Sequence, residues 1–163
     1  MKHRYHSIPT PPAEIRAATI VSRMLAGMGF RFYWATDNLA EETYAFRPCE
    51  GARSIGETVG HIWDLLNWIY RAIDPAGKTK PAGAIPLREG VLDLILILEE
   101  AFSEMDNEKL AAVQILKQPF WSIVNGPLSD TLTHIGQIVT LRRIANSPAG
   151  ESNPFRGTPP PGR

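Results

Sequence analysis

The sequence has a single cysteine, no long apolar run and no excess of charge of either sign. Cys49 has no second cysteine with which to form an internal disulfide, which is typical of proteins from reducing compartments. No apolar run approaches the roughly 20 residues needed to span a bilayer, and the stretch "MKHRYHSIPTPPAE" lacks the apolar centre of a signal peptide. We therefore expect a soluble, cytoplasmic protein.

The charge balance argues against two classes of partner. Lys and Arg total 17 and Asp and Glu total 17, so the formal net charge at pH 7 is zero. Such a chain has no general electrostatic attraction to nucleic acid or to an anionic membrane. The one local basic patch is the pair Arg142 and Arg143 in "TLRRIANSP". We predict neither a nucleic-acid partner nor a membrane partner.

Proline divides the 163 residues into a central region and two ends. Proline removes a backbone donor and restricts the residue before it, so neither proline-rich end favours a helix or a central strand. We expect a flexible N-terminus at residues 1–12, one domain at residues 13–148 and a Pro/Gly-rich tail at residues 149–163. A chain of this length can bury a core of its own.

Four segments of the central region have the apolar spacing of helices, and none alternates as a half-buried strand does. They span residues 13–39, 54–73, 87–105 and 125–146. The stretch "DNEKLAAVQILKQPFWSIVN" is ambiguous, and we interpret it as a short helical turn followed by a crossing segment. Four helices in one domain favour an all-α fold, a four-helix bundle with long connections.

The ends of two helices have recognisable signals. Ser54 is followed three residues later by Glu57, which matches a capping box at the start of the second helix. Pro127 fits the first turn of the fourth helix, where its missing N–H costs nothing. Pro148 prevents the fourth helix from extending further.

The fourth helix carries polar side chains on a face that is otherwise apolar. At about 100° per residue, Asp130, His134 and Gln137 share one sector of this helix. His61 shares a sector of the second helix with apolar residues, so its imidazole is expected to point into the bundle. Facing helices can converge such side chains on one metal ion. His61, Asp130 and His134 would then form an open three-ligand site.

Each of these residues also has a simpler explanation. A buried histidine is more often a hydrogen-bonded core group than a ligand, and Asp130 lies in a first turn, where the helix dipole favours a carboxylate. Gln137 either orients a ligand or closes a polar contact. Asp64 is either a further ligand or a solvated side chain. Trp121 either lines a pocket or belongs to the core.

A second apolar stripe lies beside this sector of the fourth helix. It consists of Leu128, Leu132, Ile135 and Val139. The apolar arc is therefore wider than the roughly 100° that one buried face needs. We expect this helix to have a second partner, and the simplest candidate is another copy of the chain, which predicts a homodimer.

The stretch "RPCEGARSIGETVGHIWDLLNW" and the later "DTLTHIGQIVTLRRIANSP" resemble the DinB/YfiT-like superfamily of small bacterial four-helix bundles. The resemblance implies a divalent-metal site with one histidine on the second helix, matched by His61, and an H-x-x-x-H pair on the fourth. His134 matches the second histidine of that pair, and Asp130 stands where the first is expected. Ile135 replaces the usual arginine. A carboxylate remains a competent ligand for Zn, Ni, Fe or Mn.

The resemblance also implies a function. It suggests a metal-dependent hydrolase or a transferase that acts with a low-molecular-weight thiol, linked to a bacterial stress response. The alternative is a non-catalytic binding or scaffolding homodimer that retains a relic of the metal site. A carboxylate-bridged di-iron centre is disfavoured, because the paired Glu-x-x-His motifs of such sites are missing from the sequence.

Overall fold

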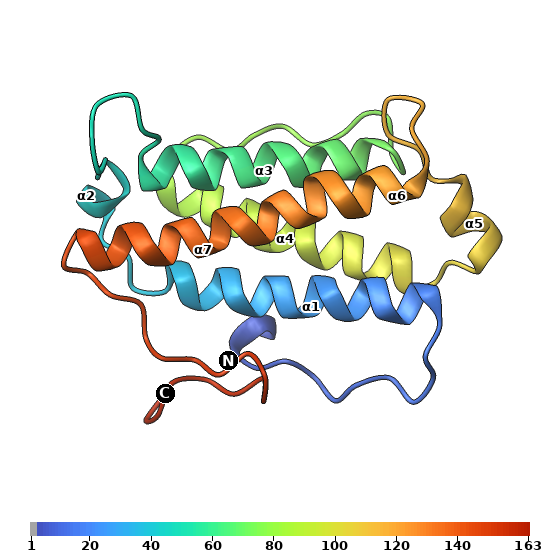
Figure 1. Ribbon diagram of the computed structural model, residues 1–163, viewed down its shortest axis with the longest axis horizontal. Coiled ribbons are helices and arrows are strands. Elements are labelled where there is room, and N and C mark those ends of the chain that lie inside the picture. Colours follow the sequence, from blue (N-terminus) through green and yellow to red (C-terminus); the bar gives the residue numbers. More distant parts are fainter. Residues whose placement is uncertain (1–2) are drawn as a thin grey trace.

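In a computed structural model, which describes residues 3–163, four long helices lie side by side around one apolar core (Figure 1). These helices are α1 (Ala17–Thr36), α3 (Ile55–Arg71), α4 (Ala84–Ser103) and α7 (Ser129–Ile144). Helices α1 and α3 each pack against both α4 and α7, which closes the ring of four. No strand forms within the described residues, so the expected all-α class is confirmed.

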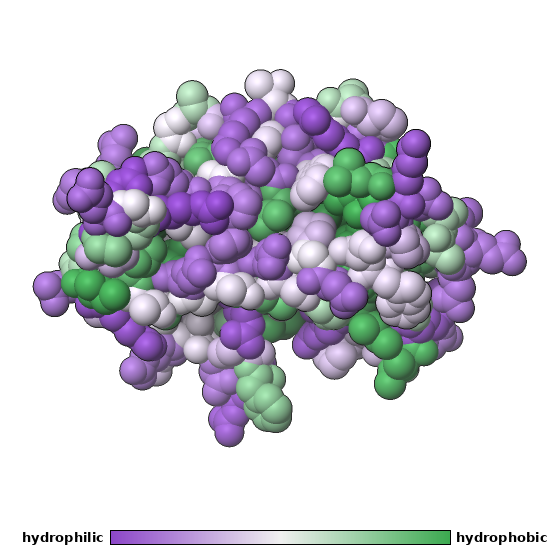
Figure 2. Space-filling model, turned by 45° about the horizontal axis from the view of Figure 1, so that its top comes forward, coloured by the Kyte–Doolittle hydropathy of each residue, from purple (hydrophilic) through white to green (hydrophobic). Residues whose placement is uncertain are grey.

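Short helical pieces lie before and between the long helices. They are the 3-10 helix η1 (Arg4–His6), α2 (Glu41–Tyr44), α5 (Asn107–Ala112), α6 (Phe120–Ile123) and the wider π-type turn η2 (Val124–Leu128). None of the helices in this part of the chain is both long and apolar enough to cross a bilayer. On the face shown in Figure 2, apolar patches are separated by polar residues.

Helix α3 is amphipathic, and its apolar stripe forms one wall of the core. Side chains three or four residues apart along this stripe are fully buried, namely Ile55, Val59, Ile62, Leu66 and Ile69. Each such side chain stabilises the fold by about 1.5–3 kcal/mol relative to an exposed position. The burial of this stripe fixes which way the remaining face of α3 is turned.

The predicted capping box is present at the start of α3. Ser54 Oγ accepts a hydrogen bond from the Glu57 backbone N–H at 3.1 Å, and Glu57 Oε2 accepts one from the Ser54 N–H at 2.8 Å. The Glu57 carboxylate also binds the guanidinium of Arg47, a contact that the sequence pattern did not indicate. The start of α3 is therefore held from two sides.

The fourth long helix begins earlier than its proline suggests. The chain is already helical at Phe120 and continues through η2 into α7, whereas the sequence predicted a start at Asn125 or Gly126. Pro127 has no N–H to donate to the preceding turn, and the backbone adjusts at Gly126 with φ −95° and ψ −105°. The turn widens there instead of ending the helix.

Two other long helices begin at a different residue from the one expected. Helix α1 begins at Ala17, not near residue 13. Helix α4 begins at Ala84, not near residue 87, because Gly83 adopts φ 91° just before it and Pro86 falls in the first turn. The first N–H groups of a helix have no partner within the helix, so proline is tolerated there.

The N-terminal segment packs against the bundle, although residues 1–12 were expected to be flexible. The first two residues of that prediction lie outside the described part of the chain. Tyr5 is 1% exposed, and its hydroxyl donates to Glu99 Oε2 at 2.9 Å. The Ile8 N–H donates to the Gly157 carbonyl at 3.0 Å. The N-terminal segment thus links α4 to the C-terminal tail.

Candidate functional site

The structure brings two of the three predicted ligands together. The His61 ring on α3 and the His134 ring on α7 meet edge to face, with ring centroids 4.7 Å apart and an interplanar angle of 76°. Both side chains are half-buried at the seam between the two helices. His61 therefore faces α7 near the surface and not the centre of the bundle.

Gln137 fixes the orientation of His134. The two side chains are one turn apart on α7, and His134 Nδ1 lies 2.7 Å from Gln137 Oε1. Since an amide oxygen only accepts hydrogen bonds, Nδ1 carries the proton and donates it. The lone pair of the neutral ring then lies on Nε2, which is the arrangement of a histidine prepared to bind a metal ion.

The surroundings of His61 favour its neutral form. Burial lowers the pKa of His61, and the positive charge of Arg53 and the neighbouring His134 lower it further. The carboxylates of Asp64 and Asp130 oppose this shift without reversing it. At neutral pH the imidazole is unprotonated, as metal binding requires.

Asp130 remains outside the pair of histidines. Its side chain is exposed in the first turn of α7, one turn before His134. Within residues 3–163, no three His, Cys, Asp or Glu side chains are grouped closely enough to hold a metal ion. The structure thus joins the two imidazoles and leaves the carboxylate apart, so the three-ligand set stays a prediction.

The donor chemistry of the pair fits a divalent ion. Two imidazoles from different helices face each other, and neither is hydrogen-bonded or ion-paired to an acidic side chain among the described residues. Two nitrogen donors and one nearby carboxylate suit Zn, Ni, Fe or Mn better than Mg or Ca, which prefer oxygen ligands. His61 and His134 would hold such an ion, and Gln137 would orient His134.

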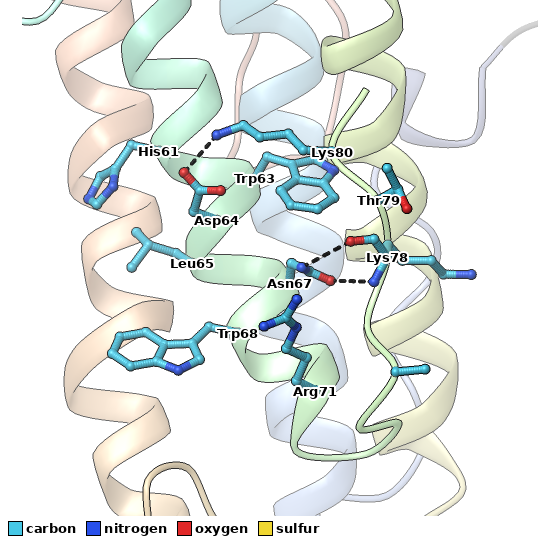
Figure 3. A pocket seen from close by; sticks show the side chains of 11 residues that line it. His61, Trp63, Asp64, Leu65, Asn67, Trp68, Arg71, Lys78, Thr79 and Lys80 are labelled. Atoms are coloured by element: carbon cyan, nitrogen blue, oxygen red, sulfur yellow. Dashed lines mark hydrogen bonds and ion pairs between the residues drawn. The ribbon is translucent and has the colours of Figure 1, made fainter. Parts of the chain in front are cut away.

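A hollow of about 650 Å³ lies next to His61, between α3 and residues 76–80 (Figure 3). Asp64 lines it, and its carboxylate is paired with Lys80 Nζ at 2.6 Å. Asn67 holds the wall of the hollow by accepting from the Lys78 N–H at 2.8 Å and donating to the Lys78 carbonyl at 3.3 Å. The sequence patterns did not indicate Asn67, whose only signal is a polar side chain in an apolar stretch.

A second hollow, of about 690 Å³, lies next to His134. Its lining includes Arg53, Thr58, Thr133, His134, Gln137 and Thr140. The two histidines therefore stand between two surface hollows, each of which reaches one ring. Nothing in the sequence indicated Arg53, because this residue precedes the capping box and belongs to no periodic pattern.

Trp121 lies in a different part of the molecule. It is 73% exposed and lines an apolar groove of about 450 Å³ with Ile20, Met24 and Leu110, between α1 and the α5–α6 region. It does not line either of the hollows beside the histidines. The structure does not bring this predicted pocket residue to the candidate site.

The second apolar stripe of α7 is covered within the chain. Leu128 and Ile135 are buried, and Leu132 and Val139 pack against the core. Helix α7 contacts both α1 and α3, so its wide apolar arc is used by two helices of the same chain. The width of the arc does not require a second subunit.

Comparisons with family models, with curated proteins and with solved structures find no match for this chain. The DinB/YfiT-like resemblance therefore rests on the sequence motifs alone. The functional proposal below rests on the geometry of the histidine pair.

Proposed function

We propose that this protein is a divalent-metal-dependent enzyme of the hydrolase or thiol-dependent transferase type, as the DinB/YfiT-like resemblance implies. His61 and His134 hold the ion, and Asp130 completes the ligand set. One observation carries the proposal, namely the contact between two imidazoles from different helices that have no acidic partner in the described structure. A bound divalent ion would act as a Lewis acid that converts a water or a thiol into a nucleophile at neutral pH.

Asp130 is a better candidate than Asp64 for the third ligand. The charges of both carboxylates act on His61. Asp64 is neutralised by Lys80, whereas Asp130 has no ion-pair partner among the described residues. Asp130 also lies four residues before His134 on α7, and residues at that spacing are neighbours on a helix surface.

Metal binding tests the proposal. Protein without a histidine tag is titrated with Zn²⁺ and Ni²⁺ by calorimetry, together with His61→Ala, His134→Ala and the control His6→Ala. We expect one ion per chain in the wild type and in the control, and binding weakened by about 100-fold or more in the other two, because each removes a ligand. A wild-type protein that binds no ion, or ligand variants that bind as the wild type does, would contradict the proposal.

The alternative is a non-catalytic homodimer in which the histidine pair is structural. It is favoured by the position of Asp130 outside the pair. Substituting His61 by Leu separates the two roles, since a structural cluster predicts unchanged or higher thermal stability, with no response to added metal in either protein. A metal site predicts that metal raises the Tm of the wild type only. Light scattering at micromolar concentration tests the dimer, and a monomeric mass would exclude it.

A further inference from the structure

The two hollows beside the histidine pair are lined by more cations than carboxylates, although the chain as a whole is neutral. Arg71, Lys78 and Lys80 line the hollow beside His61, and Arg53 lines the one beside His134. Among the described residues that line them, the only carboxylate is that of Asp64, which is paired with Lys80. Such an excess of one sign in a concave surface raises the local concentration of small ligands of the opposite sign.

Arg53 is the arginine that lines the hollow beside His134. Arg53 has no hydrogen bond or ion pair from its side chain to any described residue, whereas the nearby Arg47 is held by Glu57. Its backbone position is fixed, because the capping box begins at the next residue, Ser54. A guanidinium placed in this way has its N–H groups available to a ligand.

Few other groups in the hollow beside His134 can donate a hydrogen bond. The hydroxyl groups of its three threonines already donate to helix carbonyls, Thr58 to Ser54, Thr133 to Ser129 and Thr140 to Gly136. Gln137 differs, because its Oε1 accepts from His134 while its amide NH₂ donates no hydrogen bond to the described chain. The free donors of this hollow are therefore the Arg53 guanidinium and the Gln137 NH₂.

We propose that the hollow beside His134 binds the oxyanion group of a small substrate, a carboxylate or a phosphate, with Arg53 and Gln137 as the hydrogen-bond donors. A guanidinium matches either group with two parallel hydrogen bonds, and charge-assisted bonds of this kind are the strong ones. The volume of about 690 Å³ is that of a small-molecule site. This inference rests on the proposed function, because the oxyanion would place the rest of the substrate beside the metal ligands.

The test uses the metal-free full chain labelled with ¹⁵N, observed by NMR through the Gln137 side-chain amide and the His134 ring. The probes are phenylphosphate, benzoate and the neutral benzyl alcohol. We expect saturable shifts with the anions and none with the alcohol. Arg53→Gln should weaken anion binding by about tenfold or more, and Arg53→Lys should weaken it less, since it keeps the charge and loses the paired donors.

Two further variants make the test specific. Gln137→Glu keeps an acceptor for His134 Nδ1 but replaces the NH₂ with negative charge, and we expect it to abolish anion binding. Its readout is the His134 ring. Arg143→Gln is the matched control, because Arg143 lines a separate hollow with Arg31. It should bind the anions as the wild type does.

The outcomes separate this inference from the proposed function. Metal binding without anion binding would overturn the oxyanion site and leave the metal site standing. Anion binding that depends on Arg53, in a protein that binds no metal, would support the oxyanion site and overturn the metal-dependent function. Equal binding of benzyl alcohol, or full binding by Arg53→Gln with a wild-type circular dichroism spectrum, would overturn the inference. The tighter of the two anions identifies the substrate group.

Discussion

Gly29 is the position where one added methyl group should do the most damage to the fold. A Cβ atom at Gly29 would lie 2.5 Å from Cε1 of Tyr5 and 2.6 Å from Cδ1 and Cζ of the same ring. Gly27, on the same helix, has no atom within 4 Å of such a Cβ. Alanine is favoured over glycine by about 1 kcal/mol inside a helix, so this gain should be the same at both positions.

Gly29→Ala should therefore have the opposite effect to Gly27→Ala. The added methyl displaces the Tyr5 ring, which is 1% exposed, and breaks its hydrogen bond to Glu99. Losing the burial costs about 1.5–3 kcal/mol and losing the bond about 1 kcal/mol more. After the helix gain is subtracted, we expect Gly29→Ala to lower the free energy of unfolding by about 1.5–3 kcal/mol. Gly27→Ala should raise it by about 0.5–1 kcal/mol.

Urea denaturation followed by circular dichroism measures both changes. A double-mutant cycle identifies the cause, because in the Tyr5→Ala background the ring is gone and Gly29→Ala should become neutral or stabilising. If Gly29→Ala is as stable as Gly27→Ala in the otherwise native chain, Tyr5 is not packed against α1 as described.

Three further perturbations test the elements that position the site. Ser54→Ala removes the cap of α3 and should cost about 1 kcal/mol in urea denaturation, with the loss absent if the box does not form. The Arg47 guanidinium and the Ser54 N–H lower the pKa of Glu57 below its ordinary value of 4.5. The stabilisation that these two contacts give the folded protein is therefore present above pH 4.5, and it is lost as the pH falls through the lowered pKa of Glu57 in the folded state. Stability should fall more steeply on acidification in the wild type than in Glu57→Gln, and parallel profiles would contradict this. Leu66→Ala empties a fully buried position and should cost about 2–5 kcal/mol, whereas a loss below 1 kcal/mol would place Leu66 outside the core.

Local signals predicted the parts of the fold that depend on neighbouring residues. The Ser54 and Glu57 pattern correctly located the start of α3, because a capping box is formed by residues three positions apart. Helical periodicity placed His134 and Gln137 in one sector of the fourth helix, where a hydrogen bond joins them, since periodicity defines a face without reference to the rest of the chain. The pairing of His61 with His134 was expected from the positions of the two residues on facing helices together with the family resemblance.

The remaining features depend on contacts between distant segments. Tyr5 binds Glu99 across 94 positions, and nothing near Tyr5 in the sequence indicates this partner. Pro127 is typical of a first helical turn. The backbone conformation of Gly126, with φ −95° and ψ −105°, lets the preceding helix continue past Pro127. The sequence did not indicate Arg53, because an exposed arginine is available to a ligand only where the fold brings no acidic side chain to pair with it. The second stripe on α7 suggested another subunit because the sequence does not show that α7 contacts both α1 and α3.

Diffraction from crystals soaked in Zn²⁺, with data collected at the zinc absorption edge, tests the histidine pair most directly. We expect one anomalous peak at the seam of α3 and α7, about 2.0–2.1 Å from a nitrogen of His61 and from Nε2 of His134. An oxygen of Asp130 should be turned toward the peak. A map with no peak between the two rings, while zinc binds elsewhere or not at all, would contradict it.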